Sequence, residues 1–208
     1  MPTLTRFLSA LLLLLAVAGS RADAQRFSLA PEIGFYIPTE KLLDAANGTV
    51  GELEAGPSFG LRLALGLGNR LSVSVGGSYV PTTFAFRPGG GGTPESRDAR
   101  LFNGAAQLVA FLLPPTSMLS VFVNGGAGVV SRGGVAFTDD ADRTDVTGVL
   151  GGGATLRLGG MSVTAAADVY SYTAEYTGTT AVSSELKQLD IQLRLGLGLF
   201  GSSMGARR

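Results

Sequence analysis

The chain has 208 residues, with 16 basic and 16 acidic residues, so its formal net charge is zero. This length suits one domain or two small ones, and the balanced charge gives no electrostatic footprint for binding nucleic acid. The absence of cysteine and histidine excludes disulfides, thiol chemistry, a lipid-modified cysteine, and the commonest general base and transition-metal ligand. With 31 glycines and only 15% charged residues, the composition is unusual for a soluble globular protein.

The N-terminus carries the features of a secretory signal peptide. Arg6 precedes an apolar run from Phe7 to Ala18, and the small-x-small triplet that ends at Ala24 follows. About twelve apolar residues are fewer than the ~20 that a membrane-spanning helix needs. The pattern predicts export with cleavage after Ala24. It divides the chain into a signal peptide (1–24), a main domain (25–200) and a short C-terminal tail (201–208).

Eight segments of the main domain alternate between large apolar and small or polar residues. This period of two is typical of strands, because successive side chains leave the backbone on opposite faces. In the clearest segment, large apolar residues from Phe59 to Leu67 alternate with glycine, alanine, serine and Arg62. The predicted strands cover about 27–37, 58–68, 71–79, 102–112, 119–129, 146–158, 163–170 and 188–199.

The connections between these strands alternate in length. Short turns are predicted at 68–70, 114–118 and 159–161, and longer polar segments at about 40–55, 87–98, 131–144 and 174–185. An even number of strands with short turns at one end and long loops at the other is typical of bacterial outer-membrane barrels. Residues 39–47 are expected to form one or two helical turns over the rim. The glycine-rich segment 87–98 is expected to be mobile.

Two other architectures fit the pattern less well. The stretch between Arg100 and Arg132 has no charged residue and would suit a helical hairpin of the inner membrane. However, Pro114 and Pro115 cut it into pieces of about thirteen residues, too short for helices but long enough for tilted strands of ~9–11 residues. A soluble sandwich or lipocalin-like barrel would carry many lysines, glutamates and threonines on its polar face. Here that face consists mostly of glycine, alanine and serine.

Charged residues within the strands fall on the small-residue face. An arginine that faces lipid near the bilayer midplane costs about 2–4 kcal/mol, so this face is predicted to line the lumen while the leucines face lipid. Four of these charges lie at similar heights on strands that are consecutive around a closed barrel. They are expected to form one alternating acid–base cluster, the alternative being four separate charges in lumenal water. The lumen charges are Glu32, Arg62, Arg157, Asp168, Asp190 and Arg194, and the four at similar height are Glu32, Arg62, Asp168 and Arg194.

Motifs for cofactors and metals are weak. The glycine-rich stretches 124–128 and 148–153 faintly resemble phosphate-binding loops, but neither follows a strand and opens a helix. Asp139, Asp140 and Asp142, with Asp145 nearby, could hold calcium through carboxylates. A solvated acidic loop is the favoured interpretation, so no cofactor and no metal is expected.

The signal peptide, eight strands and polar core resemble the small outer-membrane barrels, namely the OmpA-type transmembrane domain and its OmpX-like relatives. The resemblance covers residues 25 to about 200. The last strand, Arg194–Phe200, resembles the C-terminal signal read by the barrel-assembly machinery, although Gly201–Arg208 follow it. The resemblance implies a monomer in the outer membrane, in contact with lipid and lipopolysaccharide, that meets periplasmic chaperones and the assembly machinery during biogenesis. It also implies a ring of paired charges inside the barrel.

The enzymes that this fold resembles, lipid A deacylases, palmitoyl transferases and omptin proteases, rely on a histidine that this chain lacks. A non-enzymatic role is therefore expected, either structural or in surface interaction through four external loops. One alternative is a narrow porin-like channel for small solutes. Another is a barrel that binds a lipid or a hydrophobic molecule. Eight-stranded barrels are normally filled by their own side chains, which favours the structural interpretation.

Overall fold

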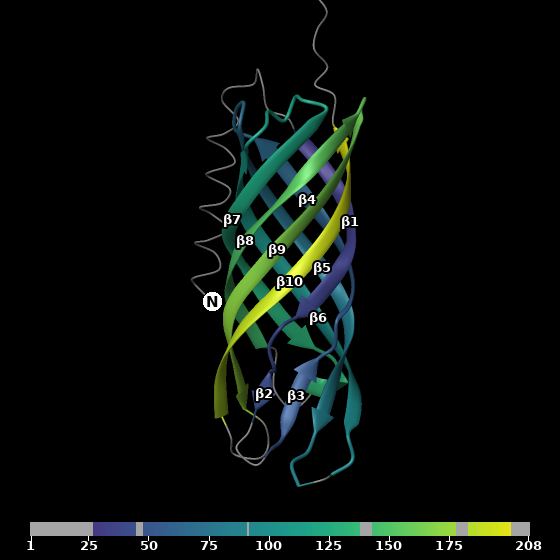
Figure 1. Ribbon diagram of the computed structural model, residues 1–208, viewed down its shortest axis with the longest axis vertical. Helices are drawn as coiled ribbons and strands as arrows, with labels where there is room; N and C mark the ends of the chain where they lie inside the picture. Colours follow the sequence, from purple (N-terminus) through teal and green to yellow (C-terminus); the bar gives the residue numbers. More distant parts are fainter. Residues whose placement is uncertain (1–26, 45–47, 91, 138–142, 178–182, 201–208) are drawn as a thin grey trace, which may run out of the picture.

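Eight long antiparallel strands close into a barrel in the computed structural model, which describes residues 27–44, 48–90, 92–137, 143–177 and 183–200 (Figure 1). Long strands that are neighbours in the chain pair with one another, and β1 pairs with β10 to close the ring. The predicted all-β, eight-stranded barrel is therefore confirmed. The strands are β1 (Phe27–Pro38), β4 (Gly56–Gly66), β5 (Leu71–Arg87), β6 (Glu95–Phe111), β7 (Leu119–Gly133), β8 (Arg143–Leu158), β9 (Met161–Thr177) and β10 (Ser183–Phe200).

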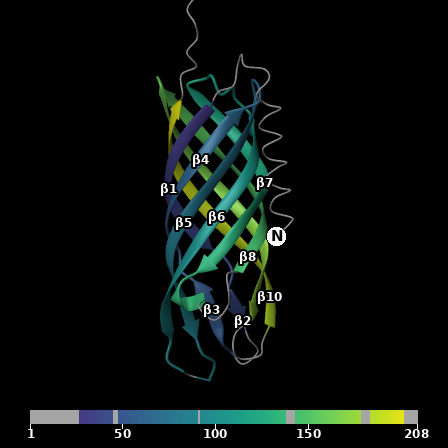
Figure 2. The same ribbon diagram turned by 180° about the vertical axis from the view of Figure 1, so that it is seen from behind.

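Large apolar side chains cover the outside of the wall, whose β4 to β7 side is seen in Figure 2. Phe59, Leu61 and Leu63 of β4 are 54%, 49% and 42% exposed. The side chain of Arg62, between them in the chain, points inward and is only 12% exposed. The same alternation on the other strands leaves an apolar belt on the outside. Its most exposed members include Ile33, Phe102, Leu108, Val146, Leu150 and Leu195.

The two ends of the barrel differ in their connections. The start of β1 and the end of β10 lie together at one end, where Ser28 pairs with Phe200 (Figure 1). Short turns join β4 to β5, β6 to β7, and β8 to β9 at this end. We call it the short-turn end and the opposite one the loop end. The alternation of short and long connections predicted from the sequence is thus present.

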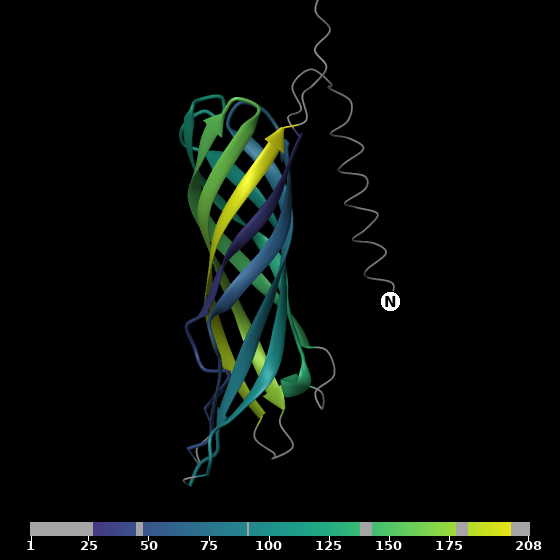
Figure 3. The ribbon, with the colours of Figure 1, turned by 90° about the vertical axis from the view of Figure 1, so that its right-hand side faces the viewer.

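Strands at the loop end run farther than the sequence pattern predicted. The β5–β6 hairpin extends to Arg87 and Glu95, and Figure 3 shows it as the part of the barrel farthest from the short turns. Strands β7, β8, β9 and β10 also enter segments that were predicted to be loops, and the 3-10 helix η1 (Val135–Phe137) follows β7. The predicted mobility of 87–98 stays a prediction. Of its described residues, Arg87 and residues 95–98 belong to these strand ends.

The helical turns predicted at 39–47 are wrong for the part that the structure describes. Residues 43–44 form the short strand β2 (Leu43–Asp44), which pairs with β3 (Val50–Leu53). Strand β3 in turn pairs with β5, since Val50 lies opposite Arg87 and Leu53 opposite Phe84. β5 runs beyond the start of β4, and the backbone groups along its edge need partners. β3 supplies them, so this segment is extended rather than helical.

The interior changes character along the barrel axis. At the loop end it is largely apolar, because Tyr36, Val80, Leu101 and Val130 are almost completely buried in one cluster with Phe84. At mid-height it holds charged and amide side chains instead. The polar lumen predicted from the sequence is thus present at mid-height, whereas the loop end combines an apolar core with buried polar residues such as Arg132 and Asp190. Large apolar residues that share the inward face pack there into a core.

Three predictions concern residues outside the described part of the chain. They are the signal peptide (1–24), the C-terminal tail (201–208) and the acidic run Asp139, Asp140 and Asp142. Within the described ranges, none of the helical segments has the length and apolar character that crossing a membrane would require.

Candidate functional site

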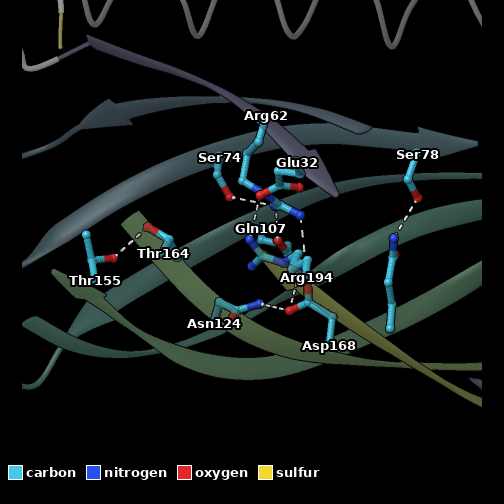
Figure 4. Close-up of polar contacts among 11 residues, drawn as sticks. Glu32, Arg62, Ser74, Ser78, Gln107, Asn124, Thr155, Thr164, Asp168 and Arg194 are labelled. Atoms are coloured by element: carbon cyan, nitrogen blue, oxygen red, sulfur yellow. Dashed lines mark hydrogen bonds and ion pairs between the residues drawn. The ribbon is translucent and has the colours of Figure 1, made fainter. Parts of the chain in front are cut away.

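Four charged side chains meet at the centre of the lumen, and we call them the lumen quartet: Glu32, Arg62, Asp168 and Arg194. They come from β1, β4, β9 and β10, which are consecutive around the barrel. Arg62 lies 2.9 Å from Glu32 (Nε to Oε1) and 3.6 Å from Asp168 (Nη2 to Oδ2). Arg194 lies 2.7 Å from each of the same two carboxylates. Each arginine therefore contacts both acids, which gives a closed ring of alternating charge (Figure 4).

The quartet is shielded from solvent and hydrogen-bonded on several sides. The side chains of Asp168, Arg194 and Glu32 are 0%, 5% and 8% exposed. Asn124 on β7 donates to Asp168 Oδ1 at 2.7 Å, and Gln107 on β6 accepts from Arg62 Nη1 at 2.5 Å. Buried charges are tolerated when they are paired and their remaining polar groups are bonded. The ring also ties one half of the wall to the other, because the two amides project from the opposite side.

Glycines on the adjacent strands make room for each of the four charged side chains. The strand register places glycine directly opposite every member. A Cβ atom at Gly151 would lie 2.3 Å from Asp168 Oδ1, and one at Gly76 would lie 3.2 Å from the Arg62 guanidinium carbon. The close packing of the quartet thus depends on the glycines opposite its members as well as on their charges. The cross-strand pairs are Glu32–Gly196, Arg62–Gly76, Asp168–Gly151 and Arg194–Gly34.

The other two predicted lumen charges lie apart from the quartet. Arg157, near the short-turn end of β8, donates from Nη2 to the carbonyl oxygen of Pro115 at 2.6 Å. Asp190, toward the loop end of β10, accepts a hydrogen bond from the Tyr172 hydroxyl at 2.5 Å and another from the Tyr36 hydroxyl. The structure therefore brings four of the six residues together and places the remaining two at different heights.

A second polar group, near the loop end, was not identified from the sequence. Arg132 of β7 forms a 2.6 Å ion pair with Asp145 of β8, and its guanidinium lies 5.1 Å from the centre of the Tyr172 ring. Tyr172 in turn bonds to Asp190. Arg132 and Asp145 fall within or beside the segment predicted as a loop, so nothing assigned them to the inward face. Tyr36 and Tyr172 lie on the same face of their strands as the predicted lumen charges Glu32 and Asp168. This period of two could have identified them as inward-facing residues.

The calcium hypothesis is not tested by the described residues. Asp145 is engaged with Arg132, and the other three acids lie outside the described part. Among the residues that the structure does describe, no group of three or more acidic side chains is arranged to hold a metal ion.

A closed eight-stranded barrel with an apolar exterior and a charged interior is the fold of the known small outer-membrane barrels. Three solved structures of such proteins share this fold with the chain. Pseudomonas aeruginosa OprG is 14% identical with a TM-score of 0.62, covering 86% of this chain and 97% of that one. Neisserial surface protein A is 12% identical with a TM-score of 0.54, covering 85% and 99%. A major outer membrane protein of Thermus thermophilus is 17% identical with a TM-score of 0.53, covering 86% and 100%.

At these identities the likeness establishes the fold and leaves the activity open. No protein-family model matches the chain, and no curated protein sequence matches it either. The argument for function therefore depends on the surface and the lumen of the barrel itself.

Proposed function

We propose that the protein spans the bacterial outer membrane as a non-enzymatic barrel whose lumen is filled, and that it serves as a structural or surface-interaction scaffold. The observation that carries the proposal is the apolar belt around a closed barrel. Soluble monomers rarely expose contiguous apolar patches larger than a few hundred Å². A wall of exposed side chains such as Ile33 at 60%, Leu150 at 70% and Leu195 at 53% is accounted for by contact with lipid. Two of its structural neighbours, OprG and the Thermus thermophilus protein, are outer membrane proteins, which supports the same membrane.

The arrangement of the two ends supports an orientation. Outer-membrane barrels have short turns on the periplasmic side and longer loops outside. The short-turn end would then face the periplasm. The loop end, with the projecting β5–β6 hairpin, would face the exterior. On this hairpin Arg87, Glu95 and Arg97 are exposed and form only surface ion pairs, with Glu52 joining Arg87. Such side chains are available to a partner, since loops and projections on a rigid scaffold commonly carry binding.

The lumen supports a scaffold rather than an open pore. The quartet crosses the middle of the barrel, and the apolar cluster around Tyr36, Val80 and Leu101 fills its loop end. Both would have to rearrange before a solute could pass. Since ions buried without partners cost several kcal/mol each, opening the quartet is unfavourable.

Two experiments test this proposal. The mature protein is expected to fractionate with the outer membrane, to begin at Gln25, and to change its mobility on detergent gels after boiling. A soluble periplasmic protein with unchanged mobility would contradict the membrane assignment. In planar bilayers we expect no steady conductance. Large, long-lived openings would show that the barrel is a channel instead.

A further inference from the structure

A cavity of about 160 Å³ lies inside the barrel between the lumen quartet and the short turns. Its inner end is formed by Glu32, Arg62 and Arg194, and it reaches Gly68 and Pro115 in the turns. Because each water molecule takes about 30 Å³ of liquid, this space suits roughly five waters or one small organic molecule. The quartet and the apolar core close off the loop end. A ligand would therefore enter from the short-turn end.

Hydroxyl groups gather on the part of the cavity wall that β7, β8 and β9 form. Ser120 of β7 lies opposite Thr155, Thr155 lies opposite Thr164, and Ser162 lies on the same face of β9 as Thr164. The two threonine hydroxyls bond to each other at 2.9 Å. Ser120 and Ser162 are only 2% and 4% exposed, yet neither hydroxyl has a hydrogen-bond partner among the residues that the structure describes. Both can therefore bond to a molecule in the cavity.

An apolar surface adjoins these hydroxyl groups. Val109 and Phe111 of β6 and Phe122 of β7 form it, with the two phenyl rings 5.9 Å apart. Phe122 lies two residues beyond Ser120 on the same inward face of β7, so the apolar and hydroxyl surfaces meet there. Small-molecule sites commonly combine mainly apolar walls with a few placed polar groups. The lining therefore suits a molecule with one polar group and a short apolar body.

The charged groups around the cavity are already engaged, which favours an uncharged occupant. The three quartet members that line it are paired among themselves and with Asp168. Arg157, at the other end, donates to the carbonyl oxygen of Pro115 and has a further interaction beyond this bond. An ion that entered would lose its hydration and would have to break one of these contacts to gain a partner. A neutral molecule avoids this cost.

We infer that this cavity binds a small uncharged alcohol with a short apolar chain. The hydroxyl group of the alcohol bonds to Ser120, and the chain packs against Phe111 and Phe122. The quartet forms the inner limit of the site and keeps its own internal pairing. This binding role goes beyond the scaffold role proposed above and does not depend on it.

1-Butanol is a suitable probe, with butyrate and butylammonium as controls that keep the chain and carry a charged head group. The full mature chain, refolded in detergent micelles, is titrated while the backbone amides of Ser120 and Ser162 are followed by NMR. We expect saturable shifts with 1-butanol in the millimolar range. Both ions should bind at least about tenfold more weakly, because each gives up its hydration without meeting a free counter-charge.

Variants separate this site from general solvent effects. Ala64→Leu fills the cavity from β4 and should abolish saturable binding, whereas Ala127→Leu makes the same change at an exposed position on β7 and should leave binding unchanged. Ser120→Ala removes the bonding hydroxyl and should weaken binding about threefold to tenfold, the effect of one hydrogen bond. Its matched control is Ser58→Ala, a buried serine on the loop-end side of Arg62, which should bind as the unmodified chain does.

Three results would overturn the inference. They are no saturable shift with 1-butanol, as for a cavity that holds water only, equal affinities for 1-butanol and butyrate, and unchanged 1-butanol affinity in Ala64→Leu. Amide spectra away from the cavity and the heat-dependent gel mobility identify a variant that has failed to fold. Ser120→Ala and the comparison of head groups then still decide the question. The barrel and its filled lumen stand under any of these outcomes, because they depend on strand pairing and the quartet.

Discussion

Disrupting the lumen quartet should destabilise the barrel strongly and cooperatively. Glu32 Oε1 accepts from both Arg62 and Arg194, so Glu32→Gln leaves two buried arginines facing a single acid, Asp168. Arg194→Met leaves the opposite excess, with two acids facing one arginine. Removing one partner of a buried ion pair costs about 3–5 kcal/mol. Each single variant should therefore lose a large share of the ~5–15 kcal/mol by which a typical domain is stable.

The double variant should lose much less than the sum of the two. With both changes made, Arg62 and Asp168 remain as one acid and one base, so no net charge stays buried. Replacing a buried ion pair by neutral side chains of similar volume is often close to neutral. The singles together would cost about 6–10 kcal/mol and the double no more than one of them, so we expect a coupling energy of at least about 2 kcal/mol.

The coupling is measured by urea unfolding of the four proteins in detergent, followed by far-ultraviolet circular dichroism. The exposed pair Arg97–Glu95, at 3.0 Å with both side chains more than half exposed, serves as the control cycle. Exposed pairs typically contribute about 0.2–1 kcal/mol. A quartet coupling below ~0.5 kcal/mol, the range in which independent sites simply add, would refute the reasoning.

Two further predictions concern packing and the membrane boundary. Gly151→Ala places a Cβ 2.3 Å from Asp168 Oδ1 and should lower the unfolding free energy by about 1–3 kcal/mol. Gly148→Ala on the same strand meets no atom closer than 3.9 Å, and losses of equal size in the two variants would contradict the packing argument. Since the chain has no cysteine, Arg100→Cys and Phe102→Cys can be labelled singly in vesicles with a water-soluble maleimide. We expect fast labelling at 100 and protection at 102, and equal rates at both positions would place the boundary elsewhere.

The strand pattern and the heights of the quartet could be predicted because the strands can be counted from a common end of the barrel. Strands β4 and β9 can be counted from a tight turn, and β1 and β10 from their ends at the same side of the barrel, while the side-chain period of two leaves little freedom to slip. Counting in this way places Glu32, Arg62, Asp168 and Arg194 at one level, as the ion pairs in the structure have them. The amides of Gln107 and Asn124 lie on the other side of the barrel. Their contacts with the quartet depend on how far each side chain extends across the lumen. The alternation of residues along one strand gives no information about this distance.

The loop end could not be predicted by the same counting. Strands β2 and β3 have two and four residues, too few for a period to be recognised. They form because the edge of β5 has backbone groups that need hydrogen-bond partners. The β5 residues that pair with β3 lie more than thirty residues farther along the chain, as in the pair Val50–Arg87. Likewise Arg132 and Asp145 pair across β7 and β8 only because both strands continue past the expected boundary. These features are consequences of tertiary pairing rather than of local sequence.

One signal for the longer strands was nevertheless present on β6. Phe102 faces outward and Asn103 inward, whereas one step farther toward the loop end Arg100 faces outward and Leu101 inward. The alternation continues but the apolar side changes from the outer face to the inner one. This inversion is expected if the environment outside the wall changes from lipid to water along the strand. Where lipid surrounds the wall, apolar side chains are favoured on the outer face. Where water surrounds it, polar side chains are favoured outside and apolar ones pack into a core inside. The Tyr79–Phe102 cross-strand pair is the last apolar outward pair on this hairpin. If the barrel spans the membrane as proposed, this pair marks the outer limit of the wall that lipid covers.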